Sequence, residues 1–437
     1  MKSLRELLRE SPYQGYLYAY PHKTAYRPLP APVRLDELWA AEPKDALFLY
    51  LHVPFCEMRC GFCNLFTAAK PAAELVRSYL AKFQRHAAIV KDALAGGSFA
   101  RLAIGGGTPT LLEPDDLATL FDVAESMGVH LHGVPISVET SPETATPEKL
   151  RLLRDRGVDR VSIGIQSFVE AEVRGVGRPQ TTAQAESALA HIRDSGAPTL
   201  NIDLMYGLAE QTEESWLGSL RAALRFRPEE LYLYPLYVRP LTGLGRSKRS
   251  WDDLRLALYR AGRDYLLAEG YRQISMRMFR RIDAGAEGGP VYRCQDDGMV
   301  GVGCGARSYT RGLHYSSAYA VGARGVREIL EAYVGRDDHR FAEVDYGFDL
   351  DEEDRRRRFV ILSLLADGLE LAEYQERFGA DALVELPELG DLEELGLAMR
   401  EGAALRLTPE GVERSDTIGP WLQSRRVDEL MGSCELR

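Results

Sequence analysis

Residues 47–66 read LFLYLHVPFCEMRCGFCNLF, an apolar run that leads into a loop with three cysteines. The first seven residues have the length and the apolar, aromatic character of a buried strand, and Pro54 ends the run. Cys56, Cys60 and Cys63 follow with the spacing C-x3-C-x2-C. Six cysteines in 437 residues are too few for a disulfide scaffold, so the loop indicates metal or redox chemistry in a reducing compartment.

Five further runs of this kind follow the first, and stretches with apolar residues three and four positions apart separate them. The predicted strands are LFLYLHV (47–53), FARLAIGG (99–106), ISVET (136–140), RVSIGIQS (160–167), TLNIDLMYG (199–207) and ELYLYPLYV (230–238). A strand and a helix that alternate about six times predict a parallel sheet, and right-handed crossovers curl it toward a barrel. The predicted fold class is therefore α/β, a partial (β/α)6 barrel.

Composition divides the chain into four predicted parts. Residues 1–46 form a tyrosine- and proline-rich arm, 47–240 the barrel, 241–345 a sheet extension that covers the substrate, and 346–437 a charged, mainly helical domain. In the last part, ALRLTPEGVERSDTIGPWL predicts a winged-helix-like unit with a short β-wing. A winged helix often binds DNA, but this segment is acid-rich, so packing or substrate covering is the favoured role.

Charge and hydropathy exclude several classes of protein. The chain has 54 basic and 65 acidic residues, a net charge of -11, which argues against tight nucleic-acid binding and against a transcription factor. The N-terminus lacks the apolar core of a signal peptide, and no run approaches the roughly 18 apolar residues that span a bilayer. We expect a soluble, cytoplasmic protein.

Three thiolates in a short loop suit an iron–sulfur cluster, because thiolates are soft, anionic ligands of iron. In a [4Fe-4S] cluster, the three cysteines leave one iron open to another ligand. Two alternatives are a zinc site with His52 as the fourth ligand and a chance grouping of cysteines. His52 lies inside the predicted strand and before Pro54, which disfavours the zinc site.

Other unusual residues also lie at the ends of predicted strands, where α/β folds place their catalytic loops. GGGTPT (105–110) follows the second strand, Glu139 ends the third, Gln166 ends the fourth, and Asp203 lies in the fifth. Glycines allow the backbone to approach a ligand closely. Each polar residue could equally be a solvated residue at the rim of the sheet.

The cysteine spacing, with an aromatic residue between the last two cysteines, resembles the signature of the radical S-adenosylmethionine (SAM) superfamily. In order along the chain, LYLHVPFCEMRCGFCN, IGGGTPT, ISVETSPE, RVSIGIQSF and NIDLMYGL are similar to the motifs of oxygen-independent coproporphyrinogen III oxidase and its HemN-like relatives. The resemblance implies a [4Fe-4S] cluster whose open iron binds SAM, with up to two SAM molecules. It also implies reductive cleavage of SAM to a 5'-deoxyadenosyl radical, and an electron donor such as flavodoxin or ferredoxin.

The resemblance also implies a role for each site residue. These are Cys56, Cys60 and Cys63 for the cluster; Tyr50 beside the cluster and the sulfonium; Phe62 at the adenine through its backbone; Gly106, Gly107 and Thr108 at the methionine amino group; Glu139 at the amino-acid end; Arg178 at the carboxylate; and Gln166 and Asp203 at the ribose. The planar fork of an arginine suits a carboxylate, and a carboxylate suits hydroxyl and ammonium groups. Taken without the resemblance, Tyr50 is an ordinary core residue and Phe62 a hydrophobic plug.

The substrate is the open question, because HemN-like proteins include oxidases, haem chaperones, haem-degrading methyltransferases, and methylases or cyclopropanases. We expect a radical SAM enzyme with coproporphyrinogen oxidase-like chemistry on a tetrapyrrole or related small molecule. The alternatives are a methylase or cyclopropanase and a haem chaperone. Leu65 stands where the oxidase characteristically has another cysteine, which argues against the true oxidase. The 46 residues before the first strand favour an enzyme with a covered site over a chaperone.

Three further features have more than one interpretation. The strip Arg277–Arg281 could contact an acidic or planar substrate, or form a solvated face, and the same holds for Arg307. Cys304 is expected to be a small buried residue, with hydrogen donation to a radical as the alternative. Cys294 and Cys434 are scattered and receive no role.

Overall fold

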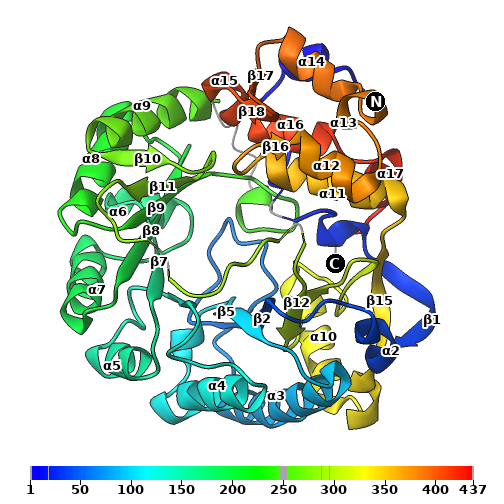
Figure 1. Ribbon diagram of the computed structural model, residues 1–437. Coiled ribbons are helices and arrows are strands. Elements are labelled where there is room, and N and C mark those ends of the chain that lie inside the picture. The colour runs from blue at the N-terminus through cyan, green and yellow to red at the C-terminus, as the bar shows by residue number, and fades with distance from the viewer. Residues whose placement is uncertain (1, 18, 247–252, 287, 295, 436–437) are drawn as a thin grey trace.

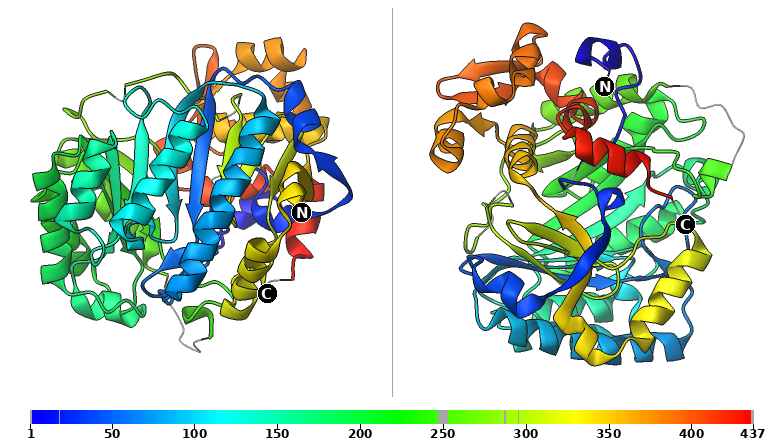
Figure 2. Two further views of the ribbon diagram at one scale, coloured as in Figure 1. Left: turned by 90° about the horizontal axis from the view of Figure 1, so that it is seen from below. Right: turned by 90° about the vertical axis from the view of Figure 1, so that its right-hand side faces the viewer.

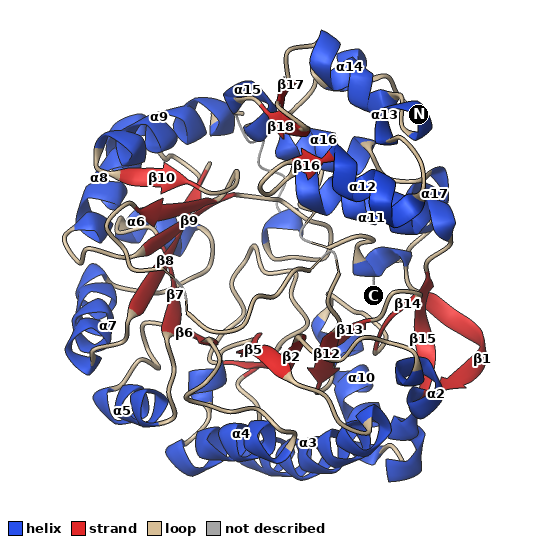
Figure 3. Cartoon of the chain, in the orientation of Figure 1, coloured by secondary structure: helices blue, strands red, loops and turns tan. Residues whose placement is uncertain are grey.

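The computed structural model describes residues 2–17, 19–246, 253–286, 288–294 and 296–435. A curved sheet forms its centre, and helices cover the outer face of that sheet (Figures 1 and 3). Of the tyrosines in the predicted arm, Tyr18 lies outside the described residues. No helix in the described ranges is long and apolar enough to span a membrane.

The described residues place 13 strands in the main sheet. In their order across the sheet, these are β1 (Arg27–Arg34), β15 (Glu343–Asp349), β14 (Leu313–Ser316), β13 (Arg307–Tyr309), β12 (Met299–Val302), β2 (Leu47–Val53), β5 (Phe99–Gly106), β6 (Ile136–Thr140), β7 (Arg160–Gln166), β8 (Thr199–Tyr206), β9 (Glu230–Pro235), β11 (Met278–Arg281) and β10 (Tyr271–Gln273). The central strands β12, β2, β5, β6, β7, β8 and β9 are parallel neighbours, and both edges are antiparallel. The α/β prediction is therefore confirmed.

Five of the predicted strands begin and end within one residue of their expected bounds, and three match them fully. β7 ends at Gln166, one residue early, because Gln166 has a φ of 69° and leaves the extended conformation. The last strand, β9, ends at Pro235 rather than at residue 238, since proline has no N–H to continue the ladder. β12 adds a parallel strand beside β2 that the strand pattern did not assign to the barrel.

Crossover helices connect the parallel strands and lie on the outer face (Figure 1). They are α3 (Ala73–Leu94), α4 (Pro114–Ser126), α5 (Pro147–Asp155), α6 (Glu170–Gly175), α7 (Thr182–Ser195), α8 (Glu213–Leu224) and α9 (Arg255–Ala268). Local sequence sets their ends. Thr181 and Thr212 each form a capping box at a helix start, and Gly196 ends α7 with a φ of 75°. Apolar side chains of these helices and of the strands share one core.

The N-terminal arm runs along the edge of the sheet and then reaches the barrel. Its elements are α1 (Leu4–Leu7), η1 (Lys23–Ala25), β1 and α2 (Leu35–Ala40). β1 has the sequence RPLPAPVR, and it pairs antiparallel with β15 near its two ends only. It is the outermost strand of the sheet, the position in which prolines are tolerated.

The C-terminal region is mainly helical and lies beside the N-terminus at one end of the barrel (Figures 1 and 2). Its elements are α11 (Glu352–Leu364), α12 (Leu371–Phe378), α13 (Ala382–Glu385), α14 (Glu388–Glu394), α15 (Pro409–Val412), α16 (Ser415–Trp421), α17 (Arg425–Gly432), β16 (Leu369–Glu370), β17 (Ala398–Glu401) and β18 (Ala404–Leu407). The preceding elements α10 (Ala323–Gly335) and η4 (Asp338–Ala342) pack against α3 of the barrel instead. β17 and β18 form the short hairpin that the sequence predicted as a wing. Leu17, Tyr20 and Tyr26 of the arm belong to the core of this region, so the two pack as one unit.

Candidate active site

The three cysteines lie on the loop after β2, and contacts on both sides hold this loop. β3 (Phe55–Cys56) pairs with β4 (Ala68–Ala69) at the base of the loop. Gly61 N donates to Val176 O at 2.7 Å, and Gly61 O accepts from Leu244 N at 2.8 Å. A Cβ at residue 61 would lie 2.8 Å from Val176 O, so glycine is required for this close approach.

All three thiols are free and half-buried, and two of them have a polar donor at the sulfur. Arg178 Nη1 donates to Cys60 Sγ at 3.4 Å, and Thr108 Oγ1 donates to Cys56 Sγ at 3.6 Å. Burial raises the pKa of Cys56 to about 12, and burial also raises the pKa of Cys63. Metal binding converts such thiols to thiolates, so proton release accompanies loading of the site.

In the described part of the chain, no three Cys, His, Asp or Glu side chains form a group that could hold a single metal ion. In a [4Fe-4S] cluster each thiolate binds a different iron, so its ligands need not converge on one point. His52, the alternative zinc ligand, has its ring nitrogens near other groups. Its Nδ1 lies 3.3 Å from Tyr50 Oη, and its Nε2 lies 3.4 Å from Phe66 O.

The glycine segment at the end of β5 lies against the strand that carries the cysteine loop. Gly107 N donates to Val53 O at 2.8 Å, and Thr108 N donates to Phe55 O at 2.7 Å. Gly106 has a φ of 115°, a conformation that side chains rarely adopt, and a Cβ at residue 107 would clash with the Phe55 backbone. The segment therefore places backbone groups directly beside the base of the cysteine loop.

Arg178 is oriented toward the cysteine loop by three contacts. Besides Cys60 Sγ, its guanidinium donates from Nη2 to Gly164 O at 2.7 Å and from Nε to Gln180 Oε1 at 2.9 Å. Gln166, two residues beyond Gly164, has the left-handed backbone described above. Such backbone strain is frequently found at ligand sites. The structure thus brings Arg178 to the cysteine loop and Gln166 to the neighbouring strand end, while their contacts with SAM stay predictions.

Two carboxyl groups lie inside the barrel on β6 and β8, the strands on either side of β7. Glu139 Oε2 accepts from Gly106 N at 3.0 Å, and a Cβ at residue 105 would lie 2.9 Å from the Glu139 carboxyl carbon, so Gly105 makes room for it. Asp203 Oδ1 accepts from Asn201 Nδ2 at 2.7 Å. Burial raises the pKa of both carboxyl groups.

Asn201 was missed in the sequence, although it precedes Asp203 by the two-residue step that puts side chains on one face of a strand. Its Nδ2 also donates to Ser162 Oγ at 2.8 Å. Its Oδ1 is buried and has no hydrogen-bond partner among the described residues. An unsatisfied buried acceptor is costly unless a water or ligand donates to it, so this atom fits a hydroxyl-bearing ligand beside Asp203.

Asp203 should give the protein a pH-dependent stability. Burial raises the pKa of its carboxyl from 3.8 to about 7 in the folded chain, opposed by Asn201 and Arg160 and reinforced by Glu139 and Glu230. Between these two pKa values, Asp203 binds a proton in the folded state that it releases in the unfolded state. The contribution of Asp203 to the free energy of unfolding therefore falls as pH rises. An Asp203→Asn variant should therefore gain thermal stability relative to wild type between about pH 5 and about pH 8. Thermal denaturation of the cluster-free proteins measures this difference; a constant difference would contradict the assignment.

Tyr50 lies on the strand before the cysteine loop, and Phe62 lies in the loop itself, between Cys60 and Cys63. Tyr50 lies on β2 beside His52, and burial lowers the pKa of His52 to about 3, so the imidazole is neutral near pH 7. Phe62 is partly buried and packs against a small apolar cluster that includes Val176 and Leu244. The plug interpretation of Phe62 agrees with this packing, and its backbone contact with adenine stays a prediction.

The strip Arg277–Arg281 is not a solvated face, which corrects one of the two interpretations. Arg277 is buried, and its Nη2 donates to Asp416 Oδ2 at 2.5 Å. Arg280 forms an ion pair with Glu230 inside the barrel. Cys304 is fully buried, as expected for a small core residue.

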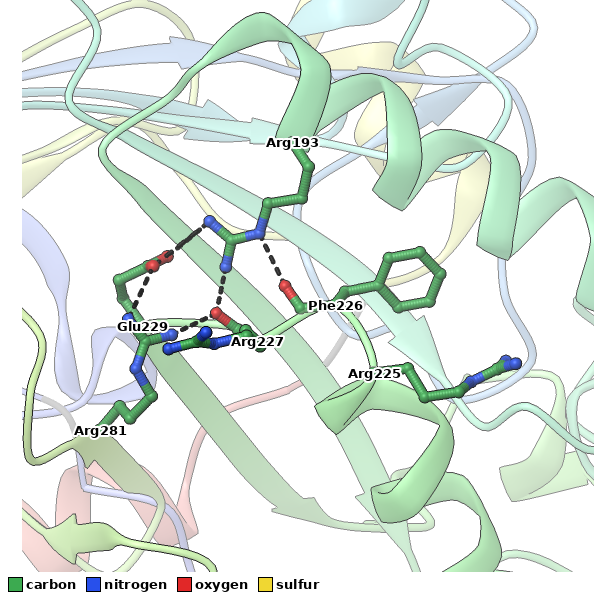
Figure 4. A pocket seen from close by; sticks show the side chains of 6 residues that line it. All are labelled: Arg193, Arg225, Phe226, Arg227, Glu229 and Arg281. Carbon is green, nitrogen blue, oxygen red and sulfur yellow. Dashed lines mark hydrogen bonds and ion pairs between the residues drawn. The ribbon is translucent and has the colours of Figure 1, made fainter.

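Two cavities lie at the amino ends of the strands, away from the cysteine loop. The smaller, of about 410 Å³, is lined by Arg193, Arg227, Glu229, Arg281 and their neighbours (Figure 4). Its arginines are engaged: Arg193 pairs with Glu229 at 2.9 Å, and Arg281 pairs with Glu229 at 3.3 Å. We interpret this network as a structural tie between α7, β9 and β11. The larger cavity, of about 850 Å³, is lined by polar strand residues and reaches Glu139 inside the barrel.

Comparison with known proteins agrees with this arrangement. Residues 50–223 match the family model for the radical SAM superfamily, and residues 350–413 match the model for the HemN C-terminal domain. The heme chaperone HemW of Escherichia coli (strain K12) is 30% identical over 273 residues, which cover 60% of this chain and 69% of HemW. The chain belongs to the HemN-like family of the radical SAM superfamily.

Relatives of this HemN-like chain have different names. Oxygen-independent coproporphyrinogen III oxidase of Paracoccus denitrificans (strain Pd 1222) is 29% identical over 418 residues, 90% of each chain. The solved structure of coproporphyrinogen III oxidase (HemN) from Escherichia coli superposes with a TM-score of 0.82 over 96% of this chain and 98% of that chain, at 23% identity. That similarity shows a common fold from the arm to the C-terminal region.

Members of this family use a [4Fe-4S] cluster and SAM, and the residues present fit both groups. Free thiols on one rigid loop supply soft ligands for the cluster. The glycine segment, Glu139, and the unsatisfied Asn201 oxygen beside Asp203 supply polar groups suited to the amino-acid and ribose parts of SAM. The prediction of a [4Fe-4S] cluster and SAM is therefore confirmed, while a second SAM molecule and the role of each residue stay proposals.

Proposed function

We propose that this chain is a radical SAM enzyme that cleaves SAM reductively and performs coproporphyrinogen oxidase-like chemistry on a tetrapyrrole or related substrate. The observation that carries the proposal is the arrangement of Cys56, Cys60 and Cys63 beside the glycine segment and Arg178, within a chain 90% of which aligns with a named oxidase. When bound, the cluster and SAM supply an electron and a carbon radical that removes a hydrogen atom from the substrate.

In this scheme, the residues of the chain bind the cluster and SAM and orient them. Cys56, Cys60 and Cys63 would hold the cluster through their thiolates and leave one coordination site for SAM. Arg178 donates to Cys60 Sγ, so its guanidinium would be available to bind the SAM carboxylate at the cysteine loop. Gly106 and Gly107, with Thr108 and Glu139, face the amino group.

Other residues bind the nucleoside end and shield the reaction. Asp203 and Gln166 accept the ribose hydroxyls, and Phe62 borders the adenine. The Tyr50 hydroxyl is hydrogen-bonded to Nδ1 of the neutral His52, which would fix the phenol beside the sulfonium. The arm and the C-terminal region pack together at one end of the barrel and keep water from the radical.

The proposed reaction balances in atoms and electrons. For each propionate, the bound cofactors would supply the radical that takes one hydrogen atom from the side chain, and the carboxylate would leave as CO2. The remaining electron passes to a one-electron acceptor, for which an iron–sulfur protein or flavoprotein is the suitable chemical class. The product would carry a vinyl group, and each decarboxylation would take one electron from the donor and pass one electron to the acceptor.

A second candidate is haem delivery, because a heme chaperone, HemW of Escherichia coli, is also among the relatives, at 30% identity. That match covers 60% of this chain, whereas the oxidase match covers 90%, so the arm and the C-terminal region support the enzyme. Leu65 stays the main departure from the oxidase pattern, and its side chain is 49% exposed on the cysteine loop.

Anaerobic turnover tests the proposal. The reconstituted protein with SAM, dithionite and coproporphyrinogen III should form 5'-deoxyadenosine and release CO2, detected by chromatography and by ¹⁴C-carboxyl label. 5'-Deoxyadenosine without CO2 would reject the decarboxylation and point to another HemN-like enzyme. Formation of S-adenosylhomocysteine would identify methyl transfer. Absence of 5'-deoxyadenosine together with tight haem binding would support the chaperone.

A further inference from the structure

Glu172 is a buried carboxylate on α6 that has no part in the scheme above. The residue is 4% exposed. Its Oε2 accepts hydrogen bonds from Ser167 Oγ at 2.6 Å and from Gln211 Nε2 at 3.1 Å, and its Oε1 accepts one from Ser215 Oγ at 2.5 Å. A buried carboxylate is costly unless hydrogen bonds satisfy it, and a satisfied buried network holds its members in place. Glu172 therefore joins α6 to the segments that carry these donors.

The three donors lie beyond the carboxyl ends of β7 and β8 and at the start of α8. Ser167 directly follows β7, Gln211 lies in the loop after β8, and Ser215 belongs to the capping box of α8. Gln211 is itself fixed in that loop, because its Oε1 accepts from Gly207 N at 2.7 Å. Glu172 thus ties α6 to the ends of two parallel strands, at the edge of the sheet where the cysteine loop also lies.

The backbone of α6 holds both Arg178 and the cysteine loop. Val173, the residue after Glu172, accepts a hydrogen bond at its carbonyl from Arg178 N at 2.9 Å. Val176, at the C-terminal end of α6, accepts at its carbonyl from Gly61 N of the cysteine loop. Both carbonyls lie within about one helical turn of Glu172. A displacement of α6 would therefore move Arg178 relative to the cysteine loop.

The end of β7 contacts the same two side chains on either side of Gln166. Before Gln166, Gly164 O accepts from Arg178 Nη2 at 2.7 Å. After Gln166, Ser167 donates to Glu172. The position of the Arg178 guanidinium is therefore set twice, once directly by β7 and once through Glu172 and α6.

We propose that Glu172 is a positioning residue for SAM binding, because it holds α6 at the spacing from β7 that places the Arg178 guanidinium at Cys60. This inference rests on the proposed function in that Arg178 binds the SAM carboxylate. Removal of the Glu172 carboxylate leaves Ser167 and Gln211, which are 1% and 5% exposed, without their shared acceptor. These side chains then need other partners, which requires α6 to move. A displacement of about 1 Å in a positioned group can cost about a hundredfold in activity.

Equilibrium dialysis of radiolabelled SAM against the anaerobic, cluster-loaded protein tests this role. Glu172→Ala should raise the Kd for SAM about tenfold, while the iron content stays that of wild type. Glu172→Gln should bind SAM like wild type. Its amide oxygen still accepts from two donors, and its amide N–H can donate to Ser215 Oγ, because a hydroxyl both donates and accepts.

Glu413→Ala is the matched control for loss of a buried carboxylate. Glu413 is 3% exposed and pairs with Arg260 and Arg263 of α9. Its variant should lower the melting temperature of the cluster-free protein and leave the Kd for SAM unchanged. This control separates the positioning of Arg178 from a general loss of stability.

A double-variant cycle shows whether Glu172 acts through Arg178. In an Arg178→Ala background, Glu172→Ala should change the Kd for SAM by less than about twofold, because the group that Glu172 positions is gone. A loss of about tenfold that adds to the loss caused by Arg178→Ala would reject the positioning role. A single Glu172→Ala variant that binds SAM like wild type would reject it as well.

Hydrogen exchange of the cluster-free protein, followed by mass spectrometry, separates this inference from the proposed function. Gly61 N donates to Val176 O, so a peptide that spans the cysteine loop should exchange faster in Glu172→Ala than in wild type or in Glu172→Gln. Equal exchange in the three proteins would contradict the anchoring of the loop by α6 and overturn the inference. If SAM binding depends on Glu172 as expected but coproporphyrinogen III releases no CO2, the decarboxylation fails and the positioning role stands.

Discussion

Replacement of Cys60 by alanine is expected to abolish the cluster and, with it, SAM cleavage. Two thiolates leave two irons of a cubane without protein ligands, and Arg178 loses the sulfur to which its Nη1 donates. Iron should fall from about four atoms per chain to a small fraction of that, and the brown colour should disappear. Iron analysis, visible absorption and 5'-deoxyadenosine formation measure the three effects on the same preparation.

The matched control for this experiment is Cys294→Ser. Cys294 is exposed and lies far from the cysteine loop in the sequence, so its variant should keep the iron content and cleavage activity of wild type. A Cys60→Ala protein that stays brown and cleaves SAM would contradict the central assignment. The melting temperature of the cluster-free variant should equal that of cluster-free wild type, because the thiol is on a loop outside the apolar core.

The second large effect concerns the buried ion pair between Arg277 of the barrel and Asp416 of α16. The side chains are 5% and 2% exposed, and Tyr237 also donates to Asp416. The ring of Tyr16 lies 3.7 Å from the guanidinium, so the pair holds the arm between the barrel and the C-terminal region. Asp416→Ala would leave the Arg277 charge buried without its counter-ion, and should cost about 3–5 kcal/mol in the free energy of unfolding.

Denaturation of single and double variants tests this assignment. An Arg277→Met/Asp416→Leu double variant removes both charges and should recover much of the stability that Asp416→Ala loses. Glu429→Ala breaks the exposed pair with Arg425 and should change the unfolding free energy by less than about 1 kcal/mol. A double variant no more stable than Asp416→Ala would show that packing at α16, and not the uncompensated charge, explains the loss.

The regular part of the fold could be predicted because its periodicity is local. β2, β5 and β6 have the expected bounds, since each is a short apolar run that a proline, glycine or polar residue ends. The edges of the sheet were harder to predict. β12 is a run of only four residues, with glycine inside it, and its place beside β2 depends on a contact about 250 positions away along the chain. Such pairings are fixed by tertiary packing, which no local pattern encodes.

The residues of the site also differ in whether the local sequence reveals them or only the fold does. Residues in motifs, such as Cys60 and Gly106, could be assigned by spacing and resemblance. Asn201 could have been found from its two-residue step to Asp203. Asp416 could not have been found in this way, because the local sequence does not distinguish it from a surface aspartate. Only the fold brings it to Arg277.

The prolines of β1 have a consequence for how this protein is handled. An open sheet edge is a template on which a second chain can add a strand. A protein with a sheet of this size is exposed to that risk at high protein concentration. Pro28, Pro30 and Pro32 each lack the N–H that an incoming strand would need, so the edge resists such growth. The arm thereby protects the sheet edge from self-association. Shortened versions of the chain that lack β1 would expose the edge of β15 and should aggregate more readily.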